Sequence, residues 1–183
     1  MIDKIITEAK NAVVAAIEGT GDVIMALENT VKGLVVSTVK GAGEVTEETV
    51  GTVAHVAKGA ILGLAGTATS AEGAAAAVVS SAVKGVSEVG GNVTEAIGGA
   101  VSGTIHGAAE MGGDVAKTAV EAVTGAIKVA GDVGADAADA ARHALTGAIK
   151  AADEIGGEVG ESIKDALKGA ASLPKEIVHS LLK

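Results

Sequence analysis

Residues 89–176 read VGGNVTEAIGGAVSGTIHGAAE, MGGDVAKTAVEAVTGAIKVAGD, VGADAADAARHALTGAIKAADE and IGGEVGESIKDALKGAASLPKE, four successive modules of 22 residues. Each module divides into two halves of eleven, and this eleven-residue frame runs from residue 1 to residue 176 without an insertion or deletion. In that alignment, Asp, Glu, Lys and Arg are absent from the first, second, fifth and ninth columns. The repeat, rather than a local motif, therefore determines the predicted fold.

The eleven-residue frame is typical of an amphipathic α-helix. Eleven residues fill three helical turns at about 3.67 residues per turn, so the uncharged columns lie on one side of a helix. With the sixth column, they form an apolar arc of about 160°, which is wider than the seam of a two-stranded coiled coil. The sequence therefore predicts an all-α protein with one continuous helix over residues 1–176. We expect such helices to pack side by side in a homo-oligomeric right-handed coiled coil, sheet or filament.

Two places in the chain are expected to interrupt the rod. Residues 66–77 read GTATSAEGAAAA and have the weakest apolar columns, so they predict a bend or a hairpin turn. Pro174 predicts a break, followed by a short C-terminal helix within residues 173–183 that Ser172 could cap. Because neither place shifts the frame, one long helix with a kinked end is favoured over two folded-back arms.

Glycine and the large apolar residues together define the predicted packing interface. Each of the 27 glycines costs a helix about 1 kcal/mol relative to alanine, so we expect a stable helix only where a neighbour buries the arc. Small residues also recur at four-residue spacing, which is similar to the small-xxx-small pattern of closely packed helices. The predicted interface consists of Val23, Leu34, Val45, Val56, Ile61, Val78, Val83, Val89, Ile105, Met111, Ile127, Val133, Ile149, Ile155, Gly59, Gly63, Gly103 and Gly107.

The fourth column of the frame alternates between polar and small residues. We interpret this alternation as a packing pattern between two helices. If one helix is shifted by eleven residues, about 16.5 Å, along the other, each carboxylate of one helix lies beside a glycine of the other. The glycine doublets at 90/91, 112/113 and 156/157 are interpreted as repeat columns, because no strand precedes them and no phosphate-binding Gly-Lys-Ser/Thr follows them. The alternating residues are Asn92, Gly103, Asp114, Gly125, Asp136, Gly147, Glu158 and Gly169.

Composition excludes several classes of protein. Phe, Tyr, Trp and Cys are absent, the net charge is −9 and 48% of the residues are hydrophobic. The chain therefore has neither the basic track nor the stacking side chains that nucleic acids require, and it is too hydrophobic for a disordered acidic tail. The first residues carry charges at helical spacing rather than the pattern of a signal peptide, so a cytoplasmic location is predicted, with association to a membrane or lipid as an alternative.

No catalytic or metal-binding pattern is evident in the sequence. The four histidines, His55, His106, His143 and His179, lie toward the polar side of the predicted helix and have no second histidine three or four residues away. The acidic cluster at residues 132, 136 and 139 lacks the glycine and the terminal glutamate of a calcium loop. The sequence therefore predicts a protein that is not an enzyme and has no cofactor or metal.

Two stretches resemble known eleven-residue repeats. Residues 38–60, TVKGAGEVTEETVGTVAHVAKGA, and residues 122–133, AVTGAIKVAGDV, are similar in style and period to the repeats of α-synuclein and the perilipins. That resemblance implies an amphipathic helix that lies on membranes or lipid droplets. Right-handed eleven-residue coiled coils are the closer physical analogue. We therefore expect a structural protein whose partner is itself, assembling through the Val/Ala/Gly-rich face; the alternative is a helix that coats a membrane, lipid droplet or storage granule.

Overall fold

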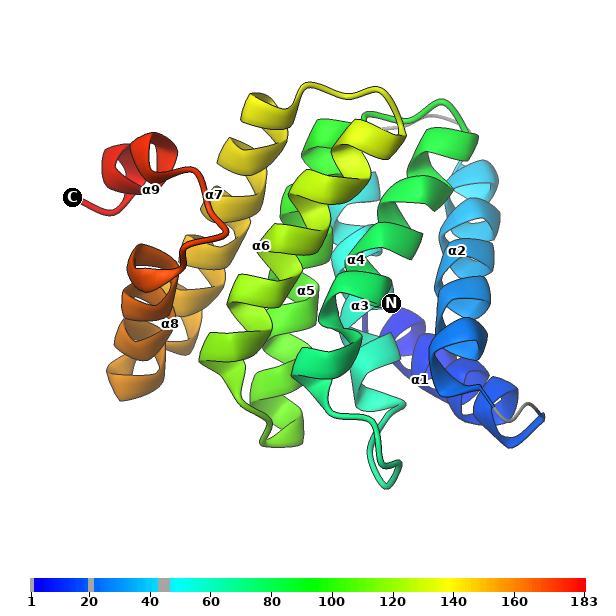
Figure 1. Cartoon of the computed structure of the whole chain (residues 1–183). Helices are drawn as coiled ribbons and strands as arrows, with labels where there is room; N and C mark the ends of the chain where they lie inside the picture. The colour runs from blue at the N-terminus through cyan, green and yellow to red at the C-terminus, as the bar shows by residue number, and fades with distance from the viewer. Residues whose placement is uncertain (1, 20–21, 43–46) are drawn as a thin grey trace.

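The computed structural model describes residues 2–19, 22–42 and 47–183, and within them the chain forms nine α-helices in two layers (Figure 1). The helices are α1 (Ile2–Gly19), α2 (Val23–Ala42), α3 (Glu47–Leu62), α4 (Ala71–Glu88), α5 (Val93–Met111), α6 (Val115–Asp132), α7 (Ala137–Ile155), α8 (Gly157–Gly169) and α9 (Lys175–Leu181). The prediction of an all-α protein is confirmed. The prediction of one continuous helix packed in a coiled coil of several chains is wrong.

Glycines in the left-handed conformation end the helices once in every two eleven-residue units. Gly90, Gly112 and Gly134 have φ angles of 73°, 77° and 75°. Without a Cβ atom, glycine adopts this conformation with little steric cost, and a helix cannot continue through it. After each of these glycines a backbone N–H reaches back over the end of the helix; that of Gly113, for example, donates to the carbonyl of Ala108 at 3.0 Å. The glycine doublets are therefore helix stop signals rather than columns of an unbroken helix.

The polar residues of the fourth column start the next helix. The side chains of Asn92, Asp114 and Asp136 each accept a hydrogen bond from the backbone N–H three residues later, at 3.3, 3.0 and 2.9 Å. These bonds satisfy donors that the first helical turn otherwise leaves unpaired. A helix and its turn together occupy one whole module, which is twice the eleven-residue period. The turn therefore leaves the frame intact, which explains why the frame alone predicted a continuous helix.

The helices stack into two layers. From α3 to α8, successive helices run in opposite directions (Figure 1). Each helix from α1 to α7 also packs against the helix two places further along the chain. The odd-numbered helices α1, α3, α5 and α7 form one layer, and the even-numbered helices α2, α4, α6 and α8 form the other, as seen where α4 and α6 lie in front of α3 and α5 (Figure 1). The short α9 packs against α7 and α8. This arrangement is an α-helical solenoid.

Glycine brings the helices of each layer into backbone contact. A Cβ atom on Gly103 of α5 would collide with the carbonyl oxygen of Ala54 on α3, and one on Gly147 of α7 would collide with that of Gly98 on α5. Among the described residues, such contacts are more frequent in the odd layer than in the even layer, so the odd helices approach one another more closely. The odd-layer glycines in such contacts are Gly59, Gly63, Gly99, Gly103, Gly107 and Gly147, and the even-layer glycines are Gly85 and Gly125.

The chain buries its own apolar arc. One continuous core of Ala, Val, Leu and Ile runs between the two layers from Ala9 to Val178. The buried hydroxyls of Thr104 and Thr118 donate to backbone carbonyls one turn earlier, at 2.8 and 2.7 Å. These two hydroxyls therefore place no unpaired polar group in the core. The neighbour that each helix was expected to find in another copy is thus another helix of the same chain.

The two expected interruptions coincide with breaks between helices. Turns and bends link α3 and α4 between Leu62 and Ala71, so only the first part of the 66–77 segment is non-helical. Pro174 occupies the N-cap position of α9 but makes no side-chain cap. The Ser172 hydroxyl, expected as that cap, instead lies 3.2 Å from the hydroxyl of Thr124 on α6. Among the described helices, none is both long enough and apolar enough to cross a membrane.

Candidate functional site

The residues predicted as an interface between chains lie between helices of one chain. Ile149 differs from the other large apolar members, because it lines a surface hollow beside α9, and Val45 lies outside the described residues. The fully buried members are Val56, Ile61, Val78, Val83, Ile105, Gly59, Gly63, Gly103 and Gly107. The partly buried members that pack against the core are Val23, Leu34, Val89, Met111, Ile127, Val133 and Ile155.

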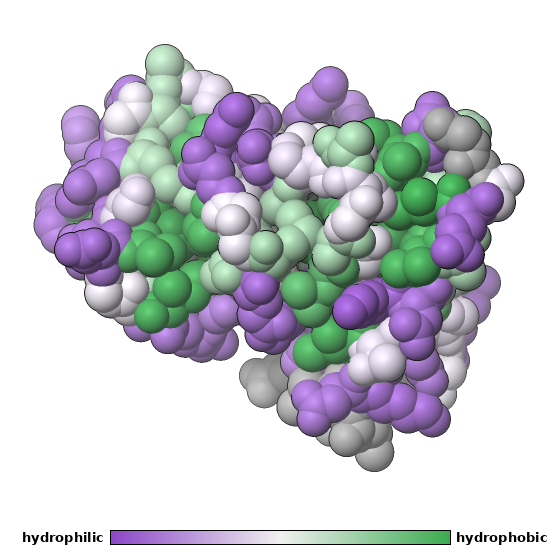
Figure 2. Space-filling model, turned by 90° about the horizontal axis from the view of Figure 1, so that it is seen from below, coloured by the Kyte–Doolittle hydropathy of each residue, from purple (hydrophilic) through white to green (hydrophobic). Residues whose placement is uncertain are grey.

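A groove crosses the outer surface of the odd layer. It consists of two adjoining hollows, each about 410 Å³ in volume, that share Gly51, Ala54, Ser102 and Lys150. The molecule seen from below is also indented along the lower edge of its outline (Figure 2). The groove residues are Asp3, Ile6, Val50, Gly51, Ala54, His55, Lys58, Glu95, Gly98, Gly99, Ser102, Gly103, His106, His143, Thr146, Gly147, Lys150 and Glu154.

Small residues form the floor of the groove. Gly51 and Ala54 on α3, Ser102 on α5 and Gly147 on α7 replace the large side chains that would otherwise fill the surface between neighbouring helices. An added Cβ on Gly51 would stand in open space, whereas Gly147 is itself buried against the backbone of Gly98 on α5. A ligand on this floor would meet small residues from α3, α5 and α7.

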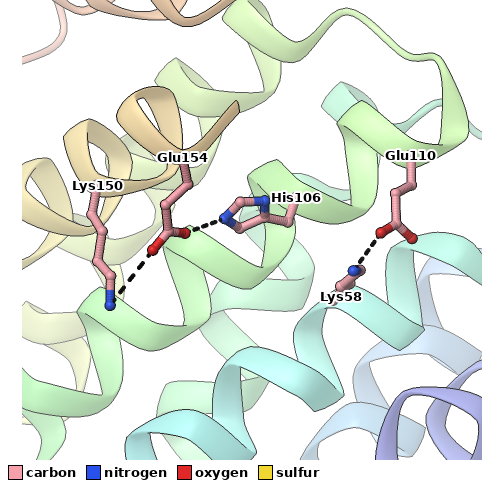
Figure 3. Close-up of polar contacts among 5 residues, drawn as sticks. All are labelled: Lys58, His106, Glu110, Lys150 and Glu154. Carbon is pink, nitrogen blue, oxygen red and sulfur yellow. Dashed lines mark hydrogen bonds and ion pairs between the residues drawn. The ribbon is translucent and has the colours of Figure 1, made fainter. Parts of the chain in front are cut away.

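Polar side chains from three helices form pairs near the groove (Figure 3). His106 Nε2 on α5 lies 2.8 Å from Glu154 Oε2 on α7, and Lys150 Nζ lies 3.9 Å from the other oxygen of the same carboxylate. Lys58 Nζ on α3 lies 2.5 Å from Glu110 Oε1 on α5. These pairs tie α3, α5 and α7 together, and the Glu154 carboxylate contacts both His106 and Lys150.

Two further histidines line the groove. Burial, and then the charge of Lys58, holds the pKa of His55 below its ordinary value of 6.5, although the Asp3 carboxylate opposes this shift. His143 Nδ1 lies 2.9 Å from the backbone carbonyl of Asp139, one turn earlier on α7. Three imidazoles, from α3, α5 and α7, therefore lie along one groove.

The groove holds no catalytic constellation among the described residues. Its hydroxyls belong to Ser102 and Thr146, and neither is hydrogen-bonded to a histidine or a carboxylate of the described chain that could act as a base. No group of three or more His, Cys, Asp or Glu in the described part of the chain is placed to hold a metal ion. The arrangement provides surface contact, hydrogen bonding and charge, which are the properties of a binding site.

The groove is not evident from the sequence. The eleven-residue frame predicts isolated histidines on a solvated face, yet His106 contacts Glu154 across 48 positions of the sequence. The repeat itself indicates which residues can meet, because helices that lie two modules apart in the sequence become neighbours in one layer. His106 and Lys150 are separated by two whole modules, so they occupy equivalent positions on α5 and α7.

Comparisons with known proteins support the fold class. The crystal structure of the de novo designed helical repeat protein DHR7 is similar over 100% of both chains, with a TM-score of 0.57 and 21% sequence identity. At this identity the similarity shows a shared helical-repeat fold, and it agrees with the correction of the single long helix. No protein-family model matches the chain. No curated protein matches it either.

Proposed function

We propose that this chain is a non-enzymatic binding scaffold whose groove holds a segment of a partner polypeptide with small side chains. The observation that carries the proposal is the floor of Gly51, Ala54, Ser102 and Gly147, which runs across parallel helices without a bulky side chain. Helical solenoids commonly use the inner surface of their curve for extended binding surfaces. A small-residue floor favours a partner whose own backbone can approach closely.

The dimensions of the odd layer suit a short peptide. Packed helices are spaced about 8–10 Å apart, so the axes of α1 and α7 are separated by roughly 24–30 Å. An extended chain of about nine residues spans this distance at about 3.3–3.6 Å per residue. The mainly apolar floor supplies contact area, and the charged side chains along it supply orientation and specificity.

Fluorescence polarisation with a nine-residue peptide of Gly, Ala and Ser tests this proposal. Ser102 is shared by both hollows, so the Ser102→Arg variant fills the groove at its centre. The matched control is Ser80→Arg, because Ser80 is a half-buried serine on α4 in the opposite layer. Binding by the wild type and the control, and its loss in Ser102→Arg, would support the proposal. A peptide affinity that Ser102→Arg leaves unchanged would contradict it.

End-to-end self-association is a second candidate function, because the exposed large apolar residues in the described part of the chain lie on the first two and the last two helices. Val14 and Met25 lie on the first two helices, and Val159 and Leu181 lie on the last two, with 36%, 51%, 43% and 39% of their surfaces exposed. Green patches also reach the surface at both ends of the molecule in Figure 2. Head-to-tail contact between unlike ends generates open filaments.

Sedimentation velocity against concentration tests the second candidate. If the ends associate, the sedimentation coefficient should rise with concentration in the wild type and stay constant in the Met25→Lys variant. A Lys4→Ala variant of the same end serves as the control, since Lys4 is exposed and polar. A concentration-independent monomer in the wild type would rule this candidate out. Coating of a lipid surface stays a prediction that no finding tests.

A further inference from the structure

The charges along the groove are unbalanced at neutral pH. Lys58 and Lys150 already face Glu110 and Glu154. Asp3 and Glu95 also line the groove, and neither carboxylate forms an ion pair with another described residue. Among the groove residues, the three carboxylates of Asp3, Glu95 and Glu154 against the two ammonium groups of Lys58 and Lys150 give a charge of −1 while the histidines are neutral. The whole chain has the same sign, with a net charge of −9.

Protonation of the histidines reverses this balance. His55, His106 and His143 all line the groove, and histidine becomes cationic between about pH 5 and 8. Three imidazolium groups would change the groove charge from −1 to +2. The fourth histidine, His179, lies on α9 and is not among the groove residues. Few side chains other than histidine titrate in this pH range, and the chain contains no cysteine.

His106 lies at the centre of the charge network. Glu154 on α7 is its hydrogen-bonding partner, and Lys150 on the same helix reaches that carboxylate as well. Lys58 and His55 face the groove from α3, and Asp3 faces it from α1. Protonated His106 would therefore neutralise the Glu154 carboxylate and leave Lys150 as an excess positive charge.

The other two histidines are close to the unpaired carboxylates. His55 is influenced by Asp3 from α1 and by Lys58 on its own helix α3. His143 on α7 lines the same hollow as Glu95 of α5 and Lys150 of its own helix. Protonation of His55 and His143 would therefore add positive charge beside Asp3 and Glu95, the two groups that are free to bind a cation.

We infer that the groove prefers a partner segment that carries lysine or arginine among small residues, and that it releases this segment as falling pH charges the groove histidines. The inference rests on the proposed binding function and adds to it the charge of the partner and the condition for release. Charge complementarity argues for a basic segment, since both the groove and the chain are negative at neutral pH. An acidic segment would meet Asp3 and Glu95 with like charge.

Three labelled peptides test the inference by fluorescence polarisation. The first has the sequence Gly-Ala-Lys-Ala-Gly-Ala-Lys-Ala-Gly, the second has Glu in place of both Lys, and the third has Ser at these positions. At about pH 7.5 and low salt, we expect the Lys peptide to bind about tenfold more tightly than the Glu peptide. At about pH 5.5 this preference should disappear or reverse.

Two variants identify the groups responsible. The triple variant His55→Gln, His106→Gln and His143→Gln should keep the preference for the Lys peptide at both pH values. The control His179→Gln should lose the preference at low pH as the wild type does, because His179 lies outside the groove. Circular dichroism checks that each variant is folded, and the comparison of peptides on the wild type holds whether or not the triple variant folds.

The outcomes separate this inference from the function on which it rests. If the Ser peptide binds but the Lys and Glu peptides bind equally, or if their ratio does not depend on pH, the inference is overturned and the proposed function stands. If no peptide binds, both are overturned. A concentration-dependent dimer that Ser102→Arg abolishes would assign the groove to a second copy of the chain and also overturn both.

Discussion

The substitution Gly103→Ala should destabilise the protein although it improves helix propensity. Gly103 lies in the middle of α5, where alanine is favoured over glycine by about 1 kcal/mol. An added Cβ would collide with the carbonyl oxygen of Ala54 and lie 2.7 Å from its carbonyl carbon and 2.8 Å from its Cα. Because these are backbone atoms of α3, no rotamer change relieves the contact, and α3 and α5 must move apart.

The expected magnitude follows from these two opposing effects. Overpacking in a well-packed interior costs about 1–3 kcal/mol, and separation of two backbones lies at the upper end of this range. After subtraction of the gain in helix propensity, we expect Gly103→Ala to lower the free energy of unfolding by about 2 kcal/mol. Gly33→Ala is the matched control, because Gly33 lies within α2 with no atom within 4 Å of the added Cβ. It should raise the stability by up to about 1 kcal/mol.

Urea denaturation followed by circular dichroism measures both variants. The midpoint should fall for Gly103→Ala and rise for Gly33→Ala, with equal slopes in the wild type and the variants. Gly85→Ala provides an intermediate case, because its contacts, with Cβ and Cγ1 of Val35 at 3.0 Å and the carbonyl oxygen of Lys32 at 3.1 Å, are longer than those of Gly103 with Ala54. If Gly103→Ala were as stable as the wild type, the close approach of α3 and α5 would be refuted.

Three further predictions concern a cap and two titrating groups. Asp114→Ala should lower the free energy of unfolding, measured in urea, by about 1 kcal/mol, because it removes the N-cap hydrogen bond of α6. The control Glu158→Ala lies in the same column but removes no cap bond, so it should change the free energy of unfolding by less than about 0.5 kcal/mol. Equal effects of the two substitutions would contradict the assigned cap. The hydrogen bond to Asp153 raises the pKa of Lys164 above its ordinary 10.5, so this stabilisation is complete below pH 10.5 and is lost as pH rises through the folded-state pKa. Thermal melts should show a smaller alkaline loss in Lys164→Gln, and an unchanged loss would contradict the link. Burial lowers the pKa of His55, so its contribution is present above pH 6.5 and is lost as pH falls through the folded-state pKa. His55→Gln should therefore retain more of its melting temperature under acid than the wild type, and equal melting curves would argue against this burial.

The sequence was sufficient to predict the helical class but not the helix boundaries. Periodicity near 3.6 residues excludes strands, and this prediction is correct. The error arose at the turns, because a helix and its turn together complete two eleven-residue units and so preserve the frame across each interruption. The helix boundary is encoded by Gly112, which adopts the left-handed conformation, together with Asp114, which caps the next helix. The same residues fit both a column of the repeat and a helix stop followed by a helix start, and the eleven-residue frame does not distinguish the two.

The groove is harder to predict from the sequence than the helix boundaries, because only the two-layer stack brings the groove residues together. Ala54, Ser102 and Gly147 lie on three different helices, α3, α5 and α7, yet they form one floor. The eleven-residue frame also places the histidines on a polar face without specifying what stands opposite them. Only the packing of every second helix sets His106 beside Glu154.

Two folds can satisfy the same eleven-residue pattern, and the turns decide between them. A continuous helix must bury its apolar arc against other chains, and association costs about 4–15 kcal/mol in lost translational and rotational freedom. A chain that folds back at each turn buries the same arc against itself and loses only the entropy of closing a loop, which is small for short connections. Left-handed glycines followed by Asn92 and Asp114 make that return favourable, since each turn satisfies the backbone groups of both helix ends. A helix running through Gly90 and Gly112 would lose those bonds and retain the cost of glycine.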